Sequence, residues 1–196
     1  MQAAVKVLPE AGQDRALAIQ TAGGWLVAVA DGAGGTGSGG AAADRLIAAI
    51  AKLAAEAASV DWWRALLELD EGLTGRGGET TAVVAFVDGD RVRGASVGDS
   101  EAWVISPTGE LADLTSHQRR KPLVGSGKAL PVEFEGDLGG GRLLLATDGL
   151  FSYTTADRIC ALASKGSIVE AADGLANCTR LSSGAFPDDV AVVIVS

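Results

Sequence analysis

The sequence predicts an α+β protein with mainly antiparallel strands. About nine short apolar runs have the length and residue types of strands, and four longer segments show helical spacing. Most consecutive strand-like runs are joined by turns too short for a crossover helix, which favours antiparallel pairing over parallel βαβ units. With 196 residues, the chain is long enough for one domain with a sizeable core.

Two helices are expected to follow the first three strands. The segment from residue 38 to about 59 is rich in alanine, and its larger apolar residues recur at helical spacing. Asp61 is suited to cap a second helix, which should end at the Asp70-Glu71-Gly72 breaker. The elements expected here are strands over 3–8, 15–20 and 24–30 and helices over 38–59 and 62–69.

The second half of the chain combines strand-like runs with two further helices. Asp88-Gly89 is a strong hairpin signal between two of the runs. Residues 106–127 are polar and show no period, so an irregular loop is expected there. The elements expected here are strands over 80–87, 91–97, 101–105, 132–134, 142–147 and 190–195 and helices over 155–163 and 167–181.

The composition excludes several classes of protein. An apolar content of 47% and a positive mean hydropathy indicate a globular chain. No apolar run is long enough for a membrane span and no secretion signal is visible, so we expect a cytoplasmic protein without a membrane partner. The formal charge of −9 argues against a nucleic-acid partner. Cys160 and Cys178 fit no metal-ligand spacing and are expected to be reduced thiols.

Acidic residues stand where strand-like runs begin or end. Asp31, Asp99 and Asp148 each follow such a run, and the pair Asp188-Asp189 precedes the last one. Carboxylates at the ends of central strands are costly to desolvate unless they are paired or bind a cation. Because hard divalent cations prefer oxygen ligands, the pattern predicts a metal site at one edge of the core.

Six short motifs carry a resemblance to one enzyme family. Each motif alone is weak, because an Asp-Gly pair is most often a turn. Together, and in this order, they resemble those of the type-2C (PPM) metal-dependent protein serine/threonine phosphatases in their compact bacterial form. The resemblance implies a single PPM-type domain over residues 1–196, with two stacked antiparallel sheets flanked by helix pairs. The motifs are Gln13-Asp14-Arg15, Asp31-Gly-Ala-Gly-Gly35, Gly78-Glu-Thr-Thr-Ala82, Gly98-Asp-Ser100, Thr147-Asp-Gly-Leu150 and Asp188-Asp189-Val190.

The resemblance also implies a reaction and a set of ligands. It implies hydrolysis of phosphoserine and phosphothreonine in proteins, with a water nucleophile activated between two Mn²⁺ or Mg²⁺ ions and no covalent intermediate. Asp31, Asp148 and Asp188 are the implied catalytic residues. The implied metal ligands are Asp31, which bridges both ions, the carbonyl of Gly32, Asp148 and Asp188, with Asp14 acting through bound water and Asp99 serving a third, weaker ion.

Two of these acidic residues have an alternative interpretation. Asp189 is expected to hydrogen-bond near the ligands rather than to bind an ion itself. For both Asp99 and Asp189, ordinary turn or cap chemistry remains the alternative.

The sequence departs from the family pattern at several places. Pro9 stands where the family has a phosphate-binding arginine, and neither Lys6 nor Arg15 is at the matching position, so the substrate-binding residues are not identified. Ala33 replaces the histidine that many eukaryotic members have as a proposed general acid. The segment between the fourth and fifth motifs is short for a mobile flap. His117, within this segment, is expected to be a solvated loop histidine.

The glycine tract at residues 32–40 allows three interpretations: nucleotide binding, a turn at the metal site of a phosphatase, and a plain turn. Gly32, Gly34 and Gly37 have the spacing of a dinucleotide-binding fingerprint, and the tract also resembles the signature loop of tubulin-like GTPases. A dinucleotide-binding unit needs a parallel strand where the sequence predicts another helix, and the chain is short for a tubulin-like GTPase. In the phosphatase interpretation, cations near the backbone leave no room for a side chain at Gly32. The third interpretation is a plain turn capped by Ser38.

Three functions are therefore carried forward. The first is an active phosphatase with a phosphorylated protein as its partner, expected to be a monomer. The second is a catalytically weak module of the same fold that binds a phosphoprotein or a regulator. The third is a nucleotide-binding protein. The acidic positions favour the first, because a binding module has no physical need for so much uncompensated charge.

Overall fold

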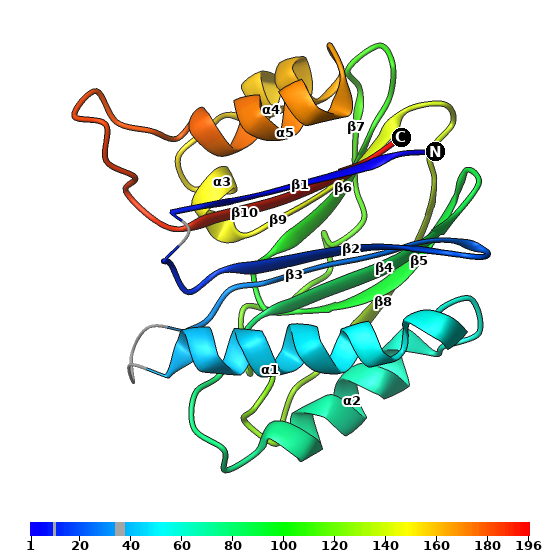
Figure 1. The fold of residues 1–196 in the computed structure, drawn as a ribbon, viewed down its shortest axis with the longest axis vertical. Helices are drawn as coiled ribbons and strands as arrows, with labels where there is room; N and C mark the ends of the chain where they lie inside the picture. The colour runs from blue at the N-terminus through cyan, green and yellow to red at the C-terminus, as the bar shows by residue number, and fades with distance from the viewer. Residues whose placement is uncertain (10, 34–37) are drawn as a thin grey trace.

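Two antiparallel sheets stack face to face, and helices cover the outer face of each (Figure 1). The computed structural model describes residues 1–9, 11–33 and 38–196. In this part of the chain, one sheet contains β1 (Ala3–Leu8), β10 (Val190–Val195), β9 (Arg142–Ala146), β6 (Glu101–Ile105) and β7 (Leu111–Asp113), in this spatial order. The other contains β2 (Arg15–Thr21), β3 (Gly24–Ala30), β4 (Ala82–Asp88), β5 (Arg91–Val97) and β8 (Val132–Asp137).

The helices form one group on each side of the paired sheets. On the side of β2 and β3 lie α1 (Gly39–Lys52), the 3₁₀ helix η2 (Ala54–Glu56) and α2 (Trp62–Leu73). On the side of β1 and β10 lie α3 (Asp148–Phe151), α4 (Ala156–Ala163) and α5 (Ile168–Asn177). This α-β-β-α arrangement confirms the fold class predicted from the sequence. Among the described residues, no helix combines the length and the apolar character needed to cross a bilayer.

Three layers of buried side chains hold the four layers of structure together. Successive side chains of a strand point to opposite faces, so each inner strand contributes to two of these layers. In β10, Val192 and Ile194 pack with the helices of that side, whereas Ala191 and Val193 pack between the two sheets. Strands buried on both faces need apolar residues at every position, which explains the continuous apolar runs of the sequence.

The boundaries of several elements differ from those predicted. The helix expected over 38–59 ends at Lys52, and the helix expected over 167–181 ends at Asn177. Helix α2 continues through the Asp70-Glu71-Gly72 segment because Leu73 packs into the core on that side, which outweighs the low helix propensity of glycine. Strand β7 lies within the loop expected to be irregular; its residues are exposed and show no apolar pattern.

Asp70 of α2 binds the segment of residues 123–129, here called the anchored loop. The Asp70 side chain is buried, and its Oδ1 accepts hydrogen bonds from the backbone N–H groups of Gly125 at 2.7 Å and Gly127 at 3.0 Å. Its Oδ2 accepts a third from the N–H of Ala129 at 2.8 Å. One carboxylate thus provides acceptors for three backbone donors outside regular secondary structure.

Two isolated β-bridges connect the anchored loop to the end of β3. Thr80 forms one bridge with Val124 of the loop and another with Gly32, which follows β3 by two residues. The backbone N–H of Thr80 and the carbonyl of Val124 are 3.0 Å apart, and the reciprocal hydrogen bond is also 3.0 Å. Asp70 therefore fixes a loop that lies directly beside the acidic motif at Asp31.

We expect Asp70→Ala to lower the free energy of unfolding by about 3 kcal/mol, because three backbone donors lose their acceptor. Urea denaturation followed by circular dichroism measures the change. Glu71→Ala, at the exposed neighbouring position, is the matched control and should leave the transition midpoint unchanged. Equal stability of Asp70→Ala and the wild type would show that solvent replaces the carboxylate at no cost.

Candidate metal centre

The antiparallel register brings the acidic motifs to one edge of the two sheets. In one sheet, Arg15 pairs with Ala30 and Ala82 with Val97, so the start of β2 lies at the same edge as the ends of β3 and β5. In the other sheet, the end of β9 at Ala146 pairs with the start of β6 at Glu101. Motifs that are far apart in the sequence therefore meet at the edge where these strands begin or end.

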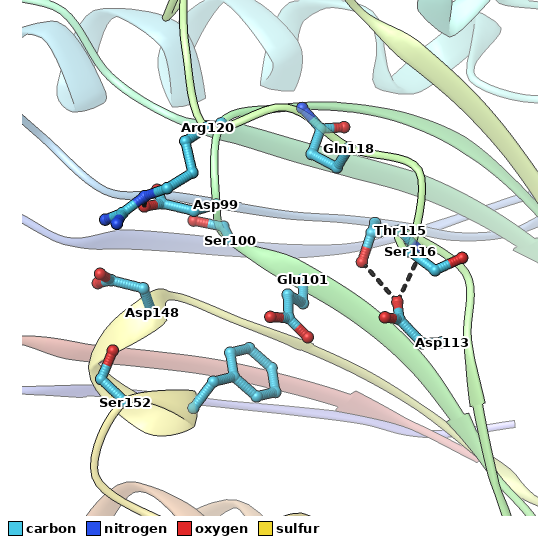
Figure 2. A pocket seen from close by; sticks show the side chains of 12 residues that line it. Asp99, Ser100, Glu101, Asp113, Thr115, Ser116, Gln118, Arg120, Asp148 and Ser152 are labelled. Carbon is cyan, nitrogen blue, oxygen red and sulfur yellow. Dashed lines mark hydrogen bonds and ion pairs between the residues drawn. The ribbon is translucent and has the colours of Figure 1, made fainter.

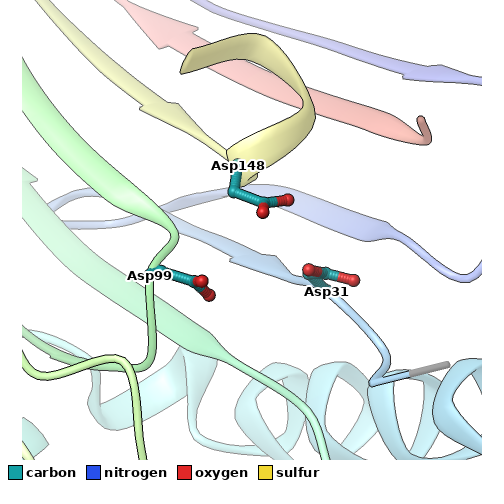
Figure 3. A group of neighbouring side chains, drawn as sticks. All are labelled: Asp31, Asp99 and Asp148. Atoms are coloured by element: carbon teal, nitrogen blue, oxygen red, sulfur yellow. The ribbon is translucent and has the colours of Figure 1, made fainter. Parts of the chain in front are cut away.

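Three carboxylates converge at this edge, from Asp31, Asp99 and Asp148 (Figure 3). One oxygen of each lies within 4.8 Å of the others. Asp31 follows β3, Asp99 lies where the chain passes from β5 in one sheet to β6 in the other, and Asp148 begins α3. The structure thus brings three of the predicted site residues together in an arrangement that could hold a hard cation. Their role as ligands stays a prediction.

Asp14 lies beside this cluster and is almost completely buried. Asp14 directly precedes β2, and its side chain is 1% exposed. Among the described residues its Oδ2 has no hydrogen-bond partner. Burial, followed by the negative charge of Asp31, raises the pKa of the Asp14 carboxyl to about 9. An unpartnered buried carboxyl oxygen is costly, and a cation nearby would remove that cost.

Desolvation also perturbs the carboxylates of the cluster itself. Burial raises the pKa of Asp31, and the charges of Asp99 and Asp188 raise it further. Burial and the charge of Asp31 raise the pKa of Asp148 to about 6. The carboxyls of Asp31 and Asp148 in the metal-free cluster therefore keep their protons to a higher pH than isolated aspartates would.

The acidic pair before β10 lies near the cluster but outside the group of three converging carboxylates. Asp188 is exposed, and its Oδ1 accepts a hydrogen bond from the N–H of Asp189 at 2.9 Å. The Asp189 Oδ2 accepts a hydrogen bond from the backbone N–H of Gln13 at 2.5 Å, which fixes the turn before β2. Asp189 thus makes the kind of hydrogen bond expected of it, whereas ligation by Asp188 stays a prediction.

Two hydroxyl groups connect the backbone of Asp31 to the segment that carries Asp99. The Thr81 Oγ1 accepts a hydrogen bond from the Asp31 N–H at 2.8 Å and lies 2.6 Å from the Oγ of Ser100. Both hydroxyl side chains are buried. Thr81 and Ser100 occur in the sequence motifs, but their positioning role depends on contacts between different strands and is visible only in the structure.

Gly32 is crowded by the protein itself. A Cβ built on Gly32 would lie 2.2 Å from the carbonyl carbon of Gly39, in the first turn of α1. The expectation that no side chain fits at Gly32 is correct, and the close approach of α1 is by itself a sufficient cause. Its predicted role as a carbonyl ligand stays a prediction.

The rest of the glycine tract gives no structural support to nucleotide binding. Gly34 and Gly37 of the proposed fingerprint lie outside the described residues. In the described part of the chain, α1 is followed by α2, and every strand pair is antiparallel. A dinucleotide-binding unit requires a parallel strand after its first helix. Ser38 precedes α1, but its side chain makes no capping hydrogen bond.

A basic residue also lies at the cluster, in the loop after β7 (Figure 2). The Nε of Arg120 donates a hydrogen bond to the Oδ2 of Asp99 at 2.6 Å. Arg120 lines two adjoining pockets together with Asp99 and Asp148, and Lys121 lines one of them. The predicted solvated state of His117 agrees with its exposure. The basic character of this loop is evident in the sequence, but the contact between Arg120 and Asp99 is not.

We expect the metal-free protein to lose stability as the pH rises from 3.8 to about 9. Asp14 and Asp148 have pKa values of 3.8 when unfolded and higher values when folded, so the folded state binds more protons in this range. Thermal unfolding in the presence of a chelator, at several pH values, measures the slope. Asp14→Asn should flatten it, because the amide needs no proton to be neutral.

Asp90→Asn makes the same chemical substitution at an exposed hairpin position and is the matched control. It should retain the wild-type slope. If the stability of Asp14→Asn depended on pH as steeply as that of the wild type, the assignment of the buried proton to Asp14 would be wrong.

Solved structures of bacterial serine/threonine phosphatases share this fold over nearly the whole chain. Stp1 from Staphylococcus aureus has a TM-score of 0.84 at 20% identity, covering 98% of this chain and 93% of that chain. MsPP, a PPM phosphatase from Mycobacterium smegmatis in complex with cacodylate, has a TM-score of 0.79 at 24% identity, covering 100% and 98%. The catalytic domain of PstP in complex with two manganese ions has a TM-score of 0.76 at 22% identity, covering 98% and 96%; PstP is a Mycobacterium tuberculosis protein.

Comparison of the sequence with protein-family models and with curated proteins finds no match. The likeness therefore rests on the structure, and it agrees with the motifs that the sequence shares with one family. The chain has the fold of the bacterial PPM-type serine/threonine phosphatases.

Proposed function

We propose that this chain is a metal-dependent phosphatase that hydrolyses phosphoserine or phosphothreonine in proteins. The observation that carries the proposal is the convergence of the Asp31, Asp99 and Asp148 carboxylates at one edge of the fold. The structures that share this fold are serine/threonine phosphatases, and one of them holds two manganese ions.

The residues at this edge fit divalent cations. They offer carboxylate oxygens, the donors that Mn²⁺ and Mg²⁺ accept. The Oδ2 of Asp14, which has no partner in the described part of the chain, and the raised pKa values of Asp14 and Asp148 are the cost of leaving these buried carboxyls uncompensated. By this proposal, Asp31, Asp148, Asp188 and the Gly32 carbonyl hold two ions. Asp14 acts through water, and Asp99 serves a third ion.

Bound divalent cations supply a lowered pKa for a water molecule and positive charge against the phosphoryl oxygens. The chain's part is to place its carboxylates before the substrate arrives. The hydrogen bonds from the Gln13 N–H to Asp189 and from the Asp31 N–H to Thr81 hold the backbone that carries Asp14 and Asp31. The buried Thr81 and Ser100 hydroxyls hydrogen-bond each other, which connects the segment that carries Asp99 to the backbone of Asp31.

A weak binding module of the same fold is the competing function. It would share the fold and the acidic edge and differ only in turnover. The uncompensated charge at the edge favours an enzyme, because a module that only binds proteins gains nothing from burying Asp14 without a partner.

We expect hydrolysis of p-nitrophenyl phosphate and of a phosphoserine peptide that requires Mn²⁺ or Mg²⁺ and stops with excess chelator. Asp31→Asn and Asp148→Asn should each lower kcat/KM at least about 100-fold, since even residues that only orient ligands contribute about 10- to 100-fold. Steady-state kinetics at fixed Mn²⁺ measures the change.

Asp90→Asn, the control for charge, should retain full activity, and circular dichroism should confirm that all variants are folded. Turnover that persists after complete chelation would refute the proposal. The same holds for a wild type that shows no turnover with any divalent ion on either substrate.

A further inference from the structure

We infer that Arg120 binds the phosphoryl group of the substrate, in the role for which the family pattern has an arginine at the position of Pro9. Lys121 assists from the next position. The inference rests on the proposed phosphatase function, and it concerns which residue of this chain recognises the phosphate.

A cationic side chain at this edge would add to the positive charge that the proposed metal ions bring to a substrate phosphate. The cluster presents several carboxylates, which repel a phosphoryl dianion until positive charge offsets them. Pro9 has no side-chain donor and no backbone N–H to offer. Among the described residues that line the pocket containing Asp31, Asp99 and Asp148, the basic ones are Arg120 and Lys121.

The two cations nearest to Pro9 in the sequence are already engaged elsewhere. The guanidinium of Arg15 donates to both carboxylate oxygens of Asp44, at 2.5 and 3.1 Å, and to the carbonyls of Gly12 and Asp14, each at 2.7 Å. The Nζ of Lys6 pairs with Asp173 of α5 at 2.8 Å. Neither can turn to a phosphate without losing these partners.

Arg120 is both close to the cluster and free to rearrange. Its side chain is 80% exposed, so no packing holds its ion pair with Asp99 in place. Exposed ion pairs of this kind contribute little to stability. Among the described contacts only the Nε of Arg120 is engaged, which leaves the four N–H groups of the guanidinium's terminal nitrogens for a phosphate.

The backbone on both sides of Arg120 is fixed, which places the side chain at the pocket. Before it, the Thr115 Oγ1 accepts a hydrogen bond from the N–H of Ala102 at 3.1 Å. After it, Asp70 holds the anchored loop of residues 123–129. Figure 2 shows the Arg120 side chain lying beside Asp99, on the side of the pocket where Asp148 also lies. A phosphate held by the cluster would thus have a guanidinium within reach.

Kinetics of the Mn²⁺-loaded protein test the inference. Arg120→Ala should raise both KM for p-nitrophenyl phosphate and the inhibition constant of inorganic phosphate about tenfold, with kcat changed less than about twofold, because one charged fork is lost from ground-state binding. Arg120→Lys should give an intermediate effect, since it keeps the charge and loses the fork. Arg119→Ala is the matched control, because Arg119 is adjacent and exposed but lines neither pocket.

Calorimetric titration of inorganic phosphate into the Mn²⁺-loaded protein separates this inference from the proposed function. Weaker phosphate binding in Arg120→Ala than in the wild type and Arg119→Ala supports it, even if the wild type shows no turnover. Unchanged phosphate affinity and KM in Arg120→Ala overturn it while leaving the phosphatase proposal intact. The inference is also overturned if only Lys121→Ala weakens phosphate binding. The same holds if Arg119→Ala and Arg120→Ala lose phosphate affinity equally.

Discussion

The burial of carboxylates at one edge of two sheets, together with their mutual repulsion, is the constraint on which this site depends. The pairing register of the strands forces these side chains together, because the acidic motifs adjoin strand ends that lie at the same edge. Three buried apolar layers stabilise that arrangement. The cost appears as raised pKa values at Asp14, Asp31 and Asp148 and as an oxygen on Asp14 that has no hydrogen-bond partner among the described residues. Bound cations are the chemical solution that fits this cost.

Much of the fold could be predicted from the sequence, because the strands are buried on both faces and read as continuous apolar runs. The acidic residues could be predicted as site residues because each stands at the end of such a run. Strand β7 could not, since its exposed residues carry no pattern and it forms only by pairing with β6. Asp70 reads as part of a helix breaker in the sequence, whereas in the structure it lies inside α2 and binds a loop more than fifty residues away.

The roles of the basic residues could not be predicted from the sequence either. Arg15 is adjacent to Asp14 in the sequence and belongs to a family motif, but Asp44 of α1 engages its guanidinium. Arg120 is remote from every motif and still reaches Asp99. Local patterns identify which residue types are present, but pairing between distant segments decides which of them remain available to a ligand. Within the described residues, Arg120 contacts only the Oδ2 of Asp99, so a cation bound by Asp99 and a phosphate bound by Arg120 would meet at this carboxylate.

The most direct test of the central claim is a calorimetric titration of Mn²⁺ into the metal-free protein at neutral pH. The acidic edge should bind two ions in the wild type and in Asp90→Asn, and Asp31→Asn should lose at least one of them while remaining folded. If the wild type binds no Mn²⁺, or if Asp31→Asn binds the same number of ions with the same affinity, then the converging carboxylates are not a cation site.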